Sequence, residues 1–400
     1  MAEQHRYWIS RGAWLLMLAL AATAQAQTFT VLHNFAGSPD GAYPIAALIR
    51  DAQGNFYGTT VAGGSSTACP VSSFGCGTVF KVDTNGNETV LYSFAGGTDG
   101  AEPYGLIRDA KGNLYGITQA GGGTGCYRQW GCGTVFAING AGEETILYSF
   151  TGGTDGAYPS GTLIRDAEGS LYGTASEGGN VYCSCGVVFK VSKTGEETVL
   201  HTFGGEDGAE PTGGVISDKG GNLYGTTQSG GSYGNVFKLS KSGTLTTLFY
   251  FSNEREGRNP NAGVTFGQDG TLYGTTLEGG APYEGDAGWG TVFRLNNSGV
   301  ETVLHSFGPW NVEGGINPWA GVIRDAKGNL YGDTEFAGPF GGGLVFKLDA
   351  SGTFIPLHNF VGPDGRYPFG NLLRDANGTI YGTASGGGTY GYGTVWKLTP

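Results

Sequence analysis

The sequence predicts an all-β protein, a seven-bladed β-propeller with four antiparallel strands in each blade. Three observations predict it. Each copy of a repeat carries four short runs that are rich in β-branched and aromatic residues and bounded by Gly, Asp or Asn. No window shows the periodicity of a capped amphipathic helix. An N-L-Y-G-T-T-like segment recurs 49 to 58 residues apart, with its tyrosine at Tyr57, Tyr115, Tyr172, Tyr224, Tyr273, Tyr331 and Tyr381. Four strands at such a period are typical of a propeller blade.

The second copy shows the four runs clearly. They span residues 105–108, 113–118, 133–138 and 144–150, and are named strands a to d from the axis outwards. The a–b and c–d turns are short and rich in Asp, Asn and Gly, whereas the b–c and d–a loops are longer and vary in length. In an antiparallel blade these two loops lie on one face. The propeller is therefore expected to have a short-turn face and a long-loop face, with function on the latter.

The two ends of the repeat region predict how the ring closes. Residues 28–35 read as a lone strand d, and residues 393–398 read as the strand c of the last copy. The first strand can therefore complete the last blade, which removes an open sheet edge.

Residues 1–26 resemble a secretory signal peptide, and residues 27–400 form the predicted propeller. Arg6 and Arg11 precede an apolar run over 13–22, and Ala24 and Ala26 form an A-x-A cleavage site. The run is shorter than the ~20 apolar residues that span a bilayer. We therefore expect a secreted or periplasmic protein without membrane insertion after cleavage, and a monomer.

The charge of the chain argues against two classes of partner. Residues 1–26 contain Arg6, Arg11 and Glu3, so the remainder has 20 basic and 33 acidic residues and a net charge of −13. Such a surface is not expected to bind nucleic acid or an anionic membrane.

Four repeated units carry a family resemblance: Y-G-T-T-x-x-G-G, G-T-V-F-K-V, E-T-V-L-Y-S-F and D-G-A-x-P. Over residues 28–400 the chain resembles the Gloeo/Verrucomicrobial tandem repeat, called GloVer. The resemblance implies an exported bacterial protein with propeller-like architecture, in a family whose members often carry C-terminal anchors. The sequence stops at Pro400 directly after a predicted strand, so no anchor is expected. The family has no established activity, so the resemblance implies architecture more than function.

Six cysteines lie in three b–c loops. An exported protein favours disulfides that close these loops, here Cys69–Cys76 and Cys126–Cys132. Cys183 and Cys185 form the weakest candidate pair, because so small a ring is strained.

Two repeated sets of side chains suggest metal binding but favour structural roles. The four histidines of the propeller occupy one position of strand d, where other copies carry Tyr or Phe: His33, His201, His305 and His358. They are expected to pack as aromatic residues. An acid–Gly pair precedes a proline in each d–a loop, with the acid at Asp40, Asp99, Asp155, Asp207, Glu256, Glu313 and Asp364. These carboxylates suit Ca²⁺, but Asp–Gly also suits a tight turn, so no cofactor is expected.

An Arg–Asp pair ends strand a in five copies, as in Arg108–Asp109. The Asp is expected to cap its own turn and the Arg to form contacts between blades. Copy four has Ser217 instead of the arginine, and copy five has Phe266.

No catalytic motif stands out, so the sequence favours an exported, non-catalytic binding or scaffold module for a glycan or peptide. Exposed aromatic residues on the long-loop face suit such recognition. The candidate ligand-binding residues are Trp130, Trp289, Trp310, Trp319, Tyr43, Tyr158 and Tyr367. The short turns are expected to be too small to build a pocket. The alternative is an extracellular polysaccharide-active enzyme, a glycosidase or lyase, that uses acids of the long-loop face.

Overall fold

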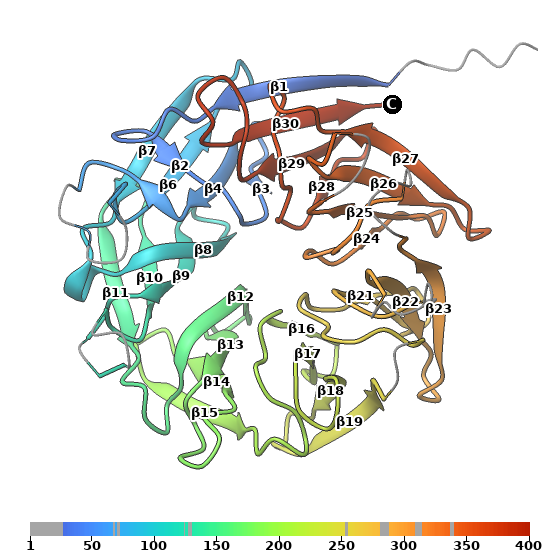
Figure 1. The fold of residues 1–400 in the computed structure, drawn as a ribbon. Helices are drawn as coiled ribbons and strands as arrows, with labels where there is room; N and C mark the ends of the chain where they lie inside the picture. Colours follow the sequence, from blue (N-terminus) through green and yellow to red (C-terminus); the bar gives the residue numbers. More distant parts are fainter. Residues whose placement is uncertain are drawn as a thin grey trace, which may run out of the picture.

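The computed structural model describes residues 27–66, 69, 73–123, 125–126, 130–252, 255–280, 288–308, 314–336 and 340–400. These residues form seven four-stranded antiparallel sheets arranged as blades around one axis (Figure 1), which confirms the predicted propeller. The strands of each blade run from the axis to the rim in chain order, except in the last blade.

Blade 1 contains β3 (Ile49–Arg50), β4 (Phe56–Thr60), β6 (Thr78–Val82) and β7 (Glu88–Ser93), and blade 2 contains β8 (Ala101–Arg108), β9 (Leu114–Ala120), β10 (Thr134–Ile138) and β11 (Glu144–Ser149). Blade 3 contains β12 (Ala157–Arg165), β13 (Leu171–Glu177), β14 (Val187–Val191) and β15 (Glu197–Thr202), and blade 4 contains β16 (Val215–Ser217), β17 (Leu223–Thr227), β18 (Asn235–Leu239) and β19 (Leu245–Tyr250). Blade 5 contains β20 (Thr265–Phe266), β21 (Leu272–Thr276), β22 (Thr291–Leu295) and β23 (Glu301–Ser306), and blade 6 contains β24 (Ile323–Arg324), β25 (Leu330–Thr334), β26 (Leu344–Leu348) and β27 (Phe354–Asn359). Blade 7 contains β28 (Leu373–Arg374), β29 (Ile380–Ala384), β30 (Thr394–Thr399) and β1 (Thr28–Asn34). A short pair, β2 (Gly41–Ala42) with β5 (Ala62–Gly63), and one turn of 3-10 helix (Gly97–Asp99) lie in the connections.

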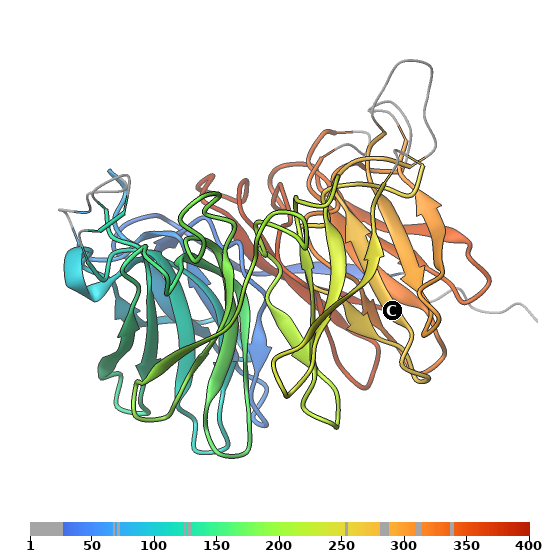
Figure 2. The ribbon, with the colours of Figure 1, turned by 90° about the horizontal axis from the view of Figure 1, so that it is seen from below.

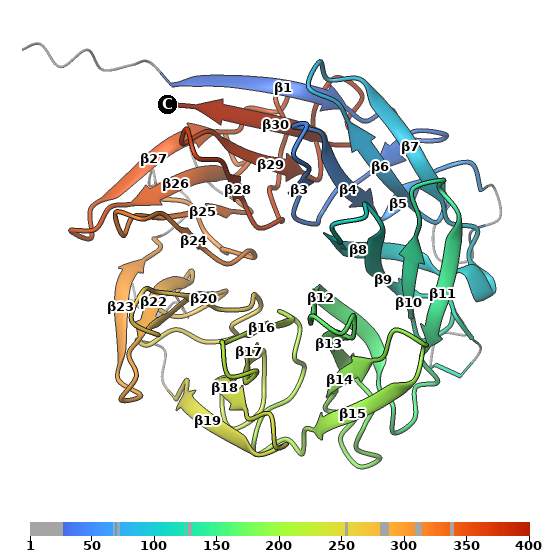
Figure 3. The same cartoon turned by 180° about the vertical axis from the view of Figure 1, so that it is seen from behind.

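Both ends of the chain build blade 7. β1 pairs antiparallel with β30, with Val31 opposite Trp396 and His33 opposite Val395. Figures 1 and 3 show the two strands side by side at the rim. The predicted closure by the first strand is therefore confirmed.

The blades separate their connections onto two faces. Figure 2 shows the b–c and d–a loops at the upper face and the tight hairpin turns at the lower face. Among the described residues, no helix is long and apolar enough to span a membrane.

The core lies between blades and is built from two aromatic side chains per repeat. One aromatic ring on strand c contacts the phenylalanine that follows strand d of the preceding blade, with ring centroids 5.0–5.7 Å apart. Those on strand c are Phe80, Phe136, Phe189, Phe237, Phe293, Phe346 and Trp396, and those after strand d are Phe94, Phe150, Phe203, Phe251, Phe307, Phe360 and Phe35. All are at most 1% exposed. These edge-to-face pairs join neighbouring blades.

The same rings explain the glycine of the Y-G-T-T unit. A Cβ at Gly58 would come within 2.6 Å of the Phe80 ring, and one at Gly116 within 2.6 Å of the Phe136 ring. Real Cβ atoms do not approach other atoms so closely, so strand b needs glycine where the ring of strand c crosses it.

Six of the seven a–b turns are built around an aspartate, as predicted, and blade 5 has Gly267 at that position. In blade 2, the backbone N–H groups of Lys111 and Asn113 donate to Asp109, and the Tyr115 hydroxyl donates to the same carboxylate at 3.2 Å. Blades 1, 3, 4, 6 and 7 repeat the tyrosine–aspartate bond at 2.9–3.1 Å. The predicted role of the Asp as the cap of its turn is confirmed.

The acids of the d–a loops also serve local structure. Asp155 accepts from the backbone N–H of Thr151 at 2.7 Å and from the Tyr148 hydroxyl at 2.9 Å. The carboxylates of Asp40, Asp99, Asp207 and Asp364 cap the same loop, and their partners on strand d are His33, Tyr92, His201 and His358 respectively. The described residues hold no group of three or more His, Cys, Asp or Glu side chains placed to share a metal ion. Glu313 lies outside the described residues.

All six cysteines are paired. The disulfides join Cys69 to Cys76, Cys126 to Cys132, and Cys183 to Cys185. The two predicted loop-closing bridges are confirmed, and the pair that sequence spacing made least favourable also forms.

Candidate functional site

The mouth of the central channel is built by seven equivalent backbone segments on the long-loop face. In each D-G-A-x-P unit or its variant, the residue before the proline has a φ of 53–60°, in the left-handed region. These residues are Tyr43, Glu102, Tyr158, Glu210, Asn259, Asn317 and Tyr367. Each donates its backbone N–H to a carbonyl in the b–c loop of the preceding blade, as from Tyr158 to Cys132 at 2.8 Å. A left-handed backbone conformation costs free energy in residues other than glycine. The hydrogen bonds to the preceding blade offset this cost and fix the backbone that leads into each strand a.

A pocket of about 250 Å³ lies where the seven d–a loops lead into the strands a. Every blade contributes residues that directly follow its proline, so the pocket lies on the axis of the propeller. The lining residues include three aromatic rings and several uncharged polar groups: Tyr104, Trp319, Phe369, Gln119, Gln228, Ser160, Thr162, Thr212, Asn261 and Asn371. None of the described residues that line it is Asp, Glu, Lys, Arg or His.

Trp319 is held in a fixed orientation at this mouth. Its ring packs edge-on against Phe369, with centroids 5.6 Å apart, and its indole N–H donates to the Glu335 carboxylate on blade 6. Burial raises the pKa of Glu335 to about 7, although the bond from Trp319 acts in the opposite direction. A tryptophan held in this way presents a rigid apolar surface to the channel.

Some polar side chains of the channel already form hydrogen bonds within the protein, and others do not. The Asn371 side chain accepts from the backbone N–H of Gly321 at 2.8 Å, and the Thr212 hydroxyl donates to the carbonyl of Asn261 at 2.9 Å. The Gln119 and Gln228 side chains form no hydrogen bond with a described residue. Their amides are therefore the groups that a ligand can engage.

The structure disperses the other predicted ligand-binding residues. Tyr43 and Tyr367 line a second hollow of about 510 Å³ on the same face, with Arg366 and the loop at Val361–Pro363. Trp289 packs against the core between blades 5 and 6, and Tyr158 packs against the core of blades 2 and 3. Trp130 is 37% exposed in the b–c loop of blade 2. Trp310 lies outside the described residues.

One acid near the channel was not singled out from the sequence. Asp333 in β25 replaces a threonine of the Y-G-T-T unit, is 1% exposed, and has no hydrogen-bond partner for either carboxyl oxygen among the described residues. Burial raises its pKa well above the usual value. In blades 4 and 5, Thr226 and Thr275 at this position donate to carbonyls of the next blade at 2.8 and 2.9 Å. The signal in the sequence was Y-G-D-T among units of Y-G-T-T.

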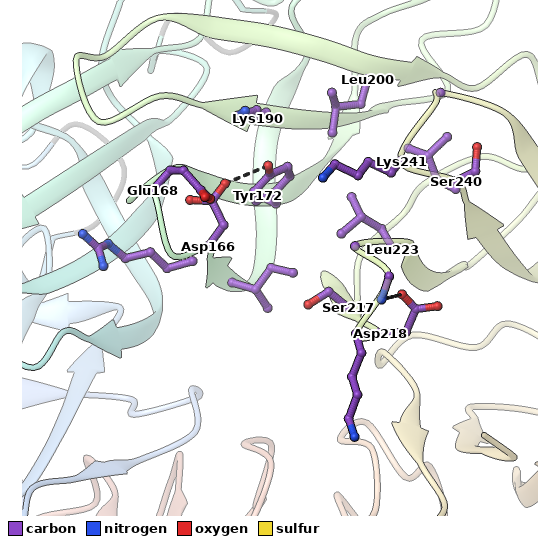
Figure 4. Close-up of a pocket in the computed structure, with 17 residues that line it drawn as sticks. Asp166, Glu168, Tyr172, Lys190, Leu200, Ser217, Asp218, Leu223, Ser240 and Lys241 are labelled. Atoms are coloured by element: carbon purple, nitrogen blue, oxygen red, sulfur yellow. Dashed lines mark hydrogen bonds between the residues drawn. The ribbon is translucent and has the colours of Figure 1, made fainter. Parts of the chain in front are cut away.

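The short-turn face also holds a pocket, so the expectation that its turns are too small to build one is wrong. A pocket of about 460 Å³ lies between blades 3 and 4, lined by Tyr172, Lys190, Ser217 and Lys241 among others (Figure 4). It forms between two neighbouring turns rather than within one, which turn length alone does not reveal.

Known structures share the fold across nearly the whole chain. An inactive variant of virginiamycin B lyase from Staphylococcus aureus, solved with quinupristin, is 15% identical with a TM-score of 0.60, over 94% of this chain and 99% of that one. The extracellular domain of a protein described as a hybrid two-component system from B. thetaiotaomicron is 14% identical with a TM-score of 0.55, over 93% of this chain and 41% of that one. A puromycin hydrolase variant is 14% identical with a TM-score of 0.53, over 87% and 51%. Such low identities show the fold alone, and the three proteins differ in function.

Sequence comparison identifies the repeat itself. Among curated proteins, none matches this chain. The family model described as the Gloeobacter/Verrucomicrobia repeat matches residues 19–125, 66–287 and 232–400, which together include every blade. The tyrosines, glycines and aspartates that build the turns and the inter-blade core thus belong to a repeat with a family of its own. The chain is a member of the Gloeobacter/Verrucomicrobia repeat family.

Proposed function

We propose that this protein is an exported, non-catalytic binding propeller that holds a neutral glycan at the channel mouth on its long-loop face. The observation that carries the proposal is the lining of the channel pocket. It combines the rings of Trp319, Tyr104 and Phe369 with amides and hydroxyls, and none of its described lining residues carries a carboxylate, an ammonium, a guanidinium or an imidazole.

The chemistry of this lining suits a neutral sugar. The faces of a sugar ring pack on aromatic side chains, and its hydroxyls exchange hydrogen bonds with amides such as those of Gln119 and Gln228. General acid–base catalysis requires a titratable group within hydrogen-bond reach of the substrate. The one titratable side chain among the described lining residues is the Tyr104 phenol, and burial raises its pKa. A lining without a carboxylate or an imidazole supports binding rather than hydrolysis.

Export rests on two supports. Residues 1–26 have the pattern of a signal peptide, and the three disulfides are typical of a protein that folds in an oxidising compartment. The bridges hold three loops of the long-loop face, which lowers the entropic cost of ordering that face when a ligand binds.

The alternative, a polysaccharide-active enzyme, is favoured by one observation in blade 6. Glu335 bonds the channel tryptophan and has its pKa raised to about 7 by burial, which suits a general acid. Its neighbour on the same face of the strand, Asp333, is 1% exposed and therefore has no access to a substrate. A glycosidase normally needs two accessible carboxyl groups, so the binding function is the better supported of the two.

The test is a screen of neutral oligosaccharides with the mature protein, followed by calorimetry on the best ligand. Trp319→Ala is expected to weaken binding about 30-fold, which corresponds to ~2 kcal/mol. Trp130→Ala is the matched control, because Trp130 is exposed on the same face but does not line the channel, and its affinity should equal that of the wild type.

Assays for polysaccharide cleavage distinguish the alternative. Glu335→Gln retains an acceptor for the Trp319 indole, so binding should persist. Cleavage by the wild-type protein that disappears in Glu335→Gln would establish the enzyme and reject the binding module. Equal affinity of wild type and Trp319→Ala would remove the channel as the binding site.

A further inference from the structure

On the short-turn face, a side chain covers the strand-b tyrosine at six of the seven junctions between blades. At five junctions, an arginine at the end of strand a lies over the strand-b tyrosine of the preceding blade, with its guanidinium carbon 5.1–5.8 Å from the ring centroid. The pairs are Arg50 with Tyr381, Arg108 with Tyr57, Arg165 with Tyr115, Arg324 with Tyr273, and Arg374 with Tyr331. At a sixth junction Phe266 packs on Tyr224, with ring centroids 5.2 Å apart. At the seventh, Ser217 of blade 4 leaves Tyr172 of blade 3 without such a cover.

The pocket of about 460 Å³ lies at this seventh junction. Four apolar side chains line it together with Tyr172 and the polar residues: Ile164, Leu200, Leu223 and Leu239. A serine in place of an arginine removes most of a long side chain, and among the described residues of blade 4 no arginine or aromatic ring takes its place over Tyr172. The cavity is therefore a consequence of one residue in the repeat, and its size is that of a small-ligand site.

Three lysines give this pocket a positive character. Lys190, Lys219 and Lys241 line it, and none of them forms a salt bridge with a described residue. The Lys190 amino group lies 5.5 Å from the centroid of the Tyr172 ring. Figure 4 shows the amino group of Lys241 directed across the pocket toward Tyr172.

Two of the three acids of the pocket are held in place by hydrogen bonds within their own blades. Asp166 accepts from the backbone N–H of Ser170 at 2.7 Å and from the Tyr172 hydroxyl at 2.9 Å. Asp218 is held in the same way within its own turn. Glu168 is the remaining acid, and the guanidinium of Arg165 is committed to Tyr115. The lining has four basic side chains, Arg165, Lys190, Lys219 and Lys241, and three acidic ones, so its net charge is +1 in a chain of net charge −12. Such a locally positive site attracts anions.

We propose that this pocket is a second binding site, which takes a carboxylate-bearing sugar ring of an acidic polysaccharide. The ring rests on Tyr172 and the surrounding leucines, and the carboxylate lies between the amino groups of Lys190 and Lys241. Lysine binds a carboxylate as a compact point charge, and a tyrosine ring is a suitable platform for a sugar. The site lies on the face opposite the channel mouth and does not depend on the function proposed there.

Calorimetry with trigalacturonate and with the neutral galactose trimer tests the proposal. The acidic trimer should bind the wild-type protein, and the neutral trimer should bind at least tenfold more weakly at this site. Ser217→Arg should abolish binding of the acidic trimer, because the new guanidinium covers Tyr172 as arginine does at five other junctions. The same substitution follows the repeat pattern, so the variant should fold with an unchanged or raised Tm.

Lysine variants locate the anion. Lys190→Gln and Lys241→Gln should each weaken binding about tenfold and reduce its dependence on salt. Lys238→Gln is the matched control: Lys238 also lies 5.5 Å from the ring of its own strand-b tyrosine, but there Phe266 fills the junction. Its affinity for the acidic trimer should equal that of the wild type.

Three results would overturn the proposal: no binding of the acidic trimer, equal binding by Ser217→Arg, or equal binding of acidic and neutral trimers at a site that Ser217→Arg blocks. Binding that survives in Ser217→Arg but is lost in Trp319→Ala belongs to the channel mouth. Failure at one site is thereby separated from failure at the other.

Discussion

At the scale of single residues, the substitutions within the repeat carry most of the information about function. Ser217 opens a pocket, and Asp333 places an unpaired carboxyl group in the core. Both were visible in the sequence as departures from a seven-fold pattern. Their significance depends on neighbours in the next blade, which a pattern along one chain does not show. Phe266 also replaces the arginine of the pattern, yet it fills its junction by packing on Tyr224.

Asp333→Thr should stabilise the protein at pH 7. An unsatisfied buried polar group costs roughly 1–3 kcal/mol, and a threonine here can donate to a carbonyl of the next blade, as Thr275 does. The pKa of Asp333 is raised in the folded protein. As pH rises above the unfolded pKa, the unfolded chain releases a proton that the folded chain retains, and stability falls. The advantage of Asp333→Thr should therefore be larger at pH 7 than at pH 4 in urea unfolding.

The reverse change in another blade is the control for Asp333. Thr275→Asp should lower stability at pH 7 by a similar amount. If Asp333→Thr is neutral or destabilising at pH 7, the carboxyl group has a partner that offsets its burial.

At the scale of strands, the first residue of strand d is a glutamate in four of the seven blades, and it makes the stability of the protein sensitive to pH. Burial, together with a carboxylate of the preceding d–a loop, raises the pKa of four glutamates to about 7: Glu88, Glu144, Glu197 and Glu301. For Glu88 that neighbour is Asp40, while His33 acts in the opposite direction. These groups hold protons in the folded protein that the unfolded chain has already lost above a pH of about 4.5.

The free energy of unfolding is therefore expected to fall as pH rises from about 4.5 to about 7. Burial lowers the pKa of His305 to about 4 and also lowers that of His358, which opposes the trend below pH 6.5, but the carboxyl groups outnumber the histidines. The Tm should be higher at pH 5.5 than at pH 8. A variant with all four glutamates changed to glutamine should show a flatter profile, and an unchanged profile would exclude these residues as the cause.

The architecture was accessible from the sequence because each element repeats a local rule. Asp109 and its equivalents cap turns by short-range hydrogen bonds, and the Y-G-T-T glycine faces the aromatic residue directly opposite it on strand c. Because both rules repeat along the chain, the sequence shows the same blade seven times. The candidate site was harder to predict from the sequence. Trp319 was named among the long-loop aromatics, but the channel pocket arises from backbone that all seven blades contribute. Tyr158 and Trp289 share its composition signal yet pack into the core. Composition marks a residue as able to bind, whereas its position relative to the axis depends on closure of the ring.

At the scale of the whole molecule, stability depends on one pairing between the ends of the chain. β1 covers the edge of β30 and contributes Phe35, which is fully buried against Phe80 of blade 1. A protein that lacks residues 27–35 should unfold at a markedly lower temperature, and a synthetic peptide of residues 27–35 should restore the original Tm when added in trans.

The buried phenylalanine provides the control for that peptide. Loss of a buried Phe side chain costs about 3 kcal/mol, so a Phe35→Ala peptide should bind about 100-fold more weakly. A truncated protein with the wild-type Tm, or equal binding of both peptides, would show that the ring does not depend on this strand.

The pairing of Thr28 with Thr399 also orders events during biosynthesis. β1 is the first strand of the propeller that the ribosome makes, and its partner β30 is the last. Each of blades 1 to 6 draws its strands from one continuous stretch of chain and can pair them as it emerges, whereas contacts between distant segments form slowly. The leading strand must remain without its partner until the last strand of the propeller has been made. Only a chain that includes β30 can therefore close the ring, and a chain that ends one strand earlier cannot.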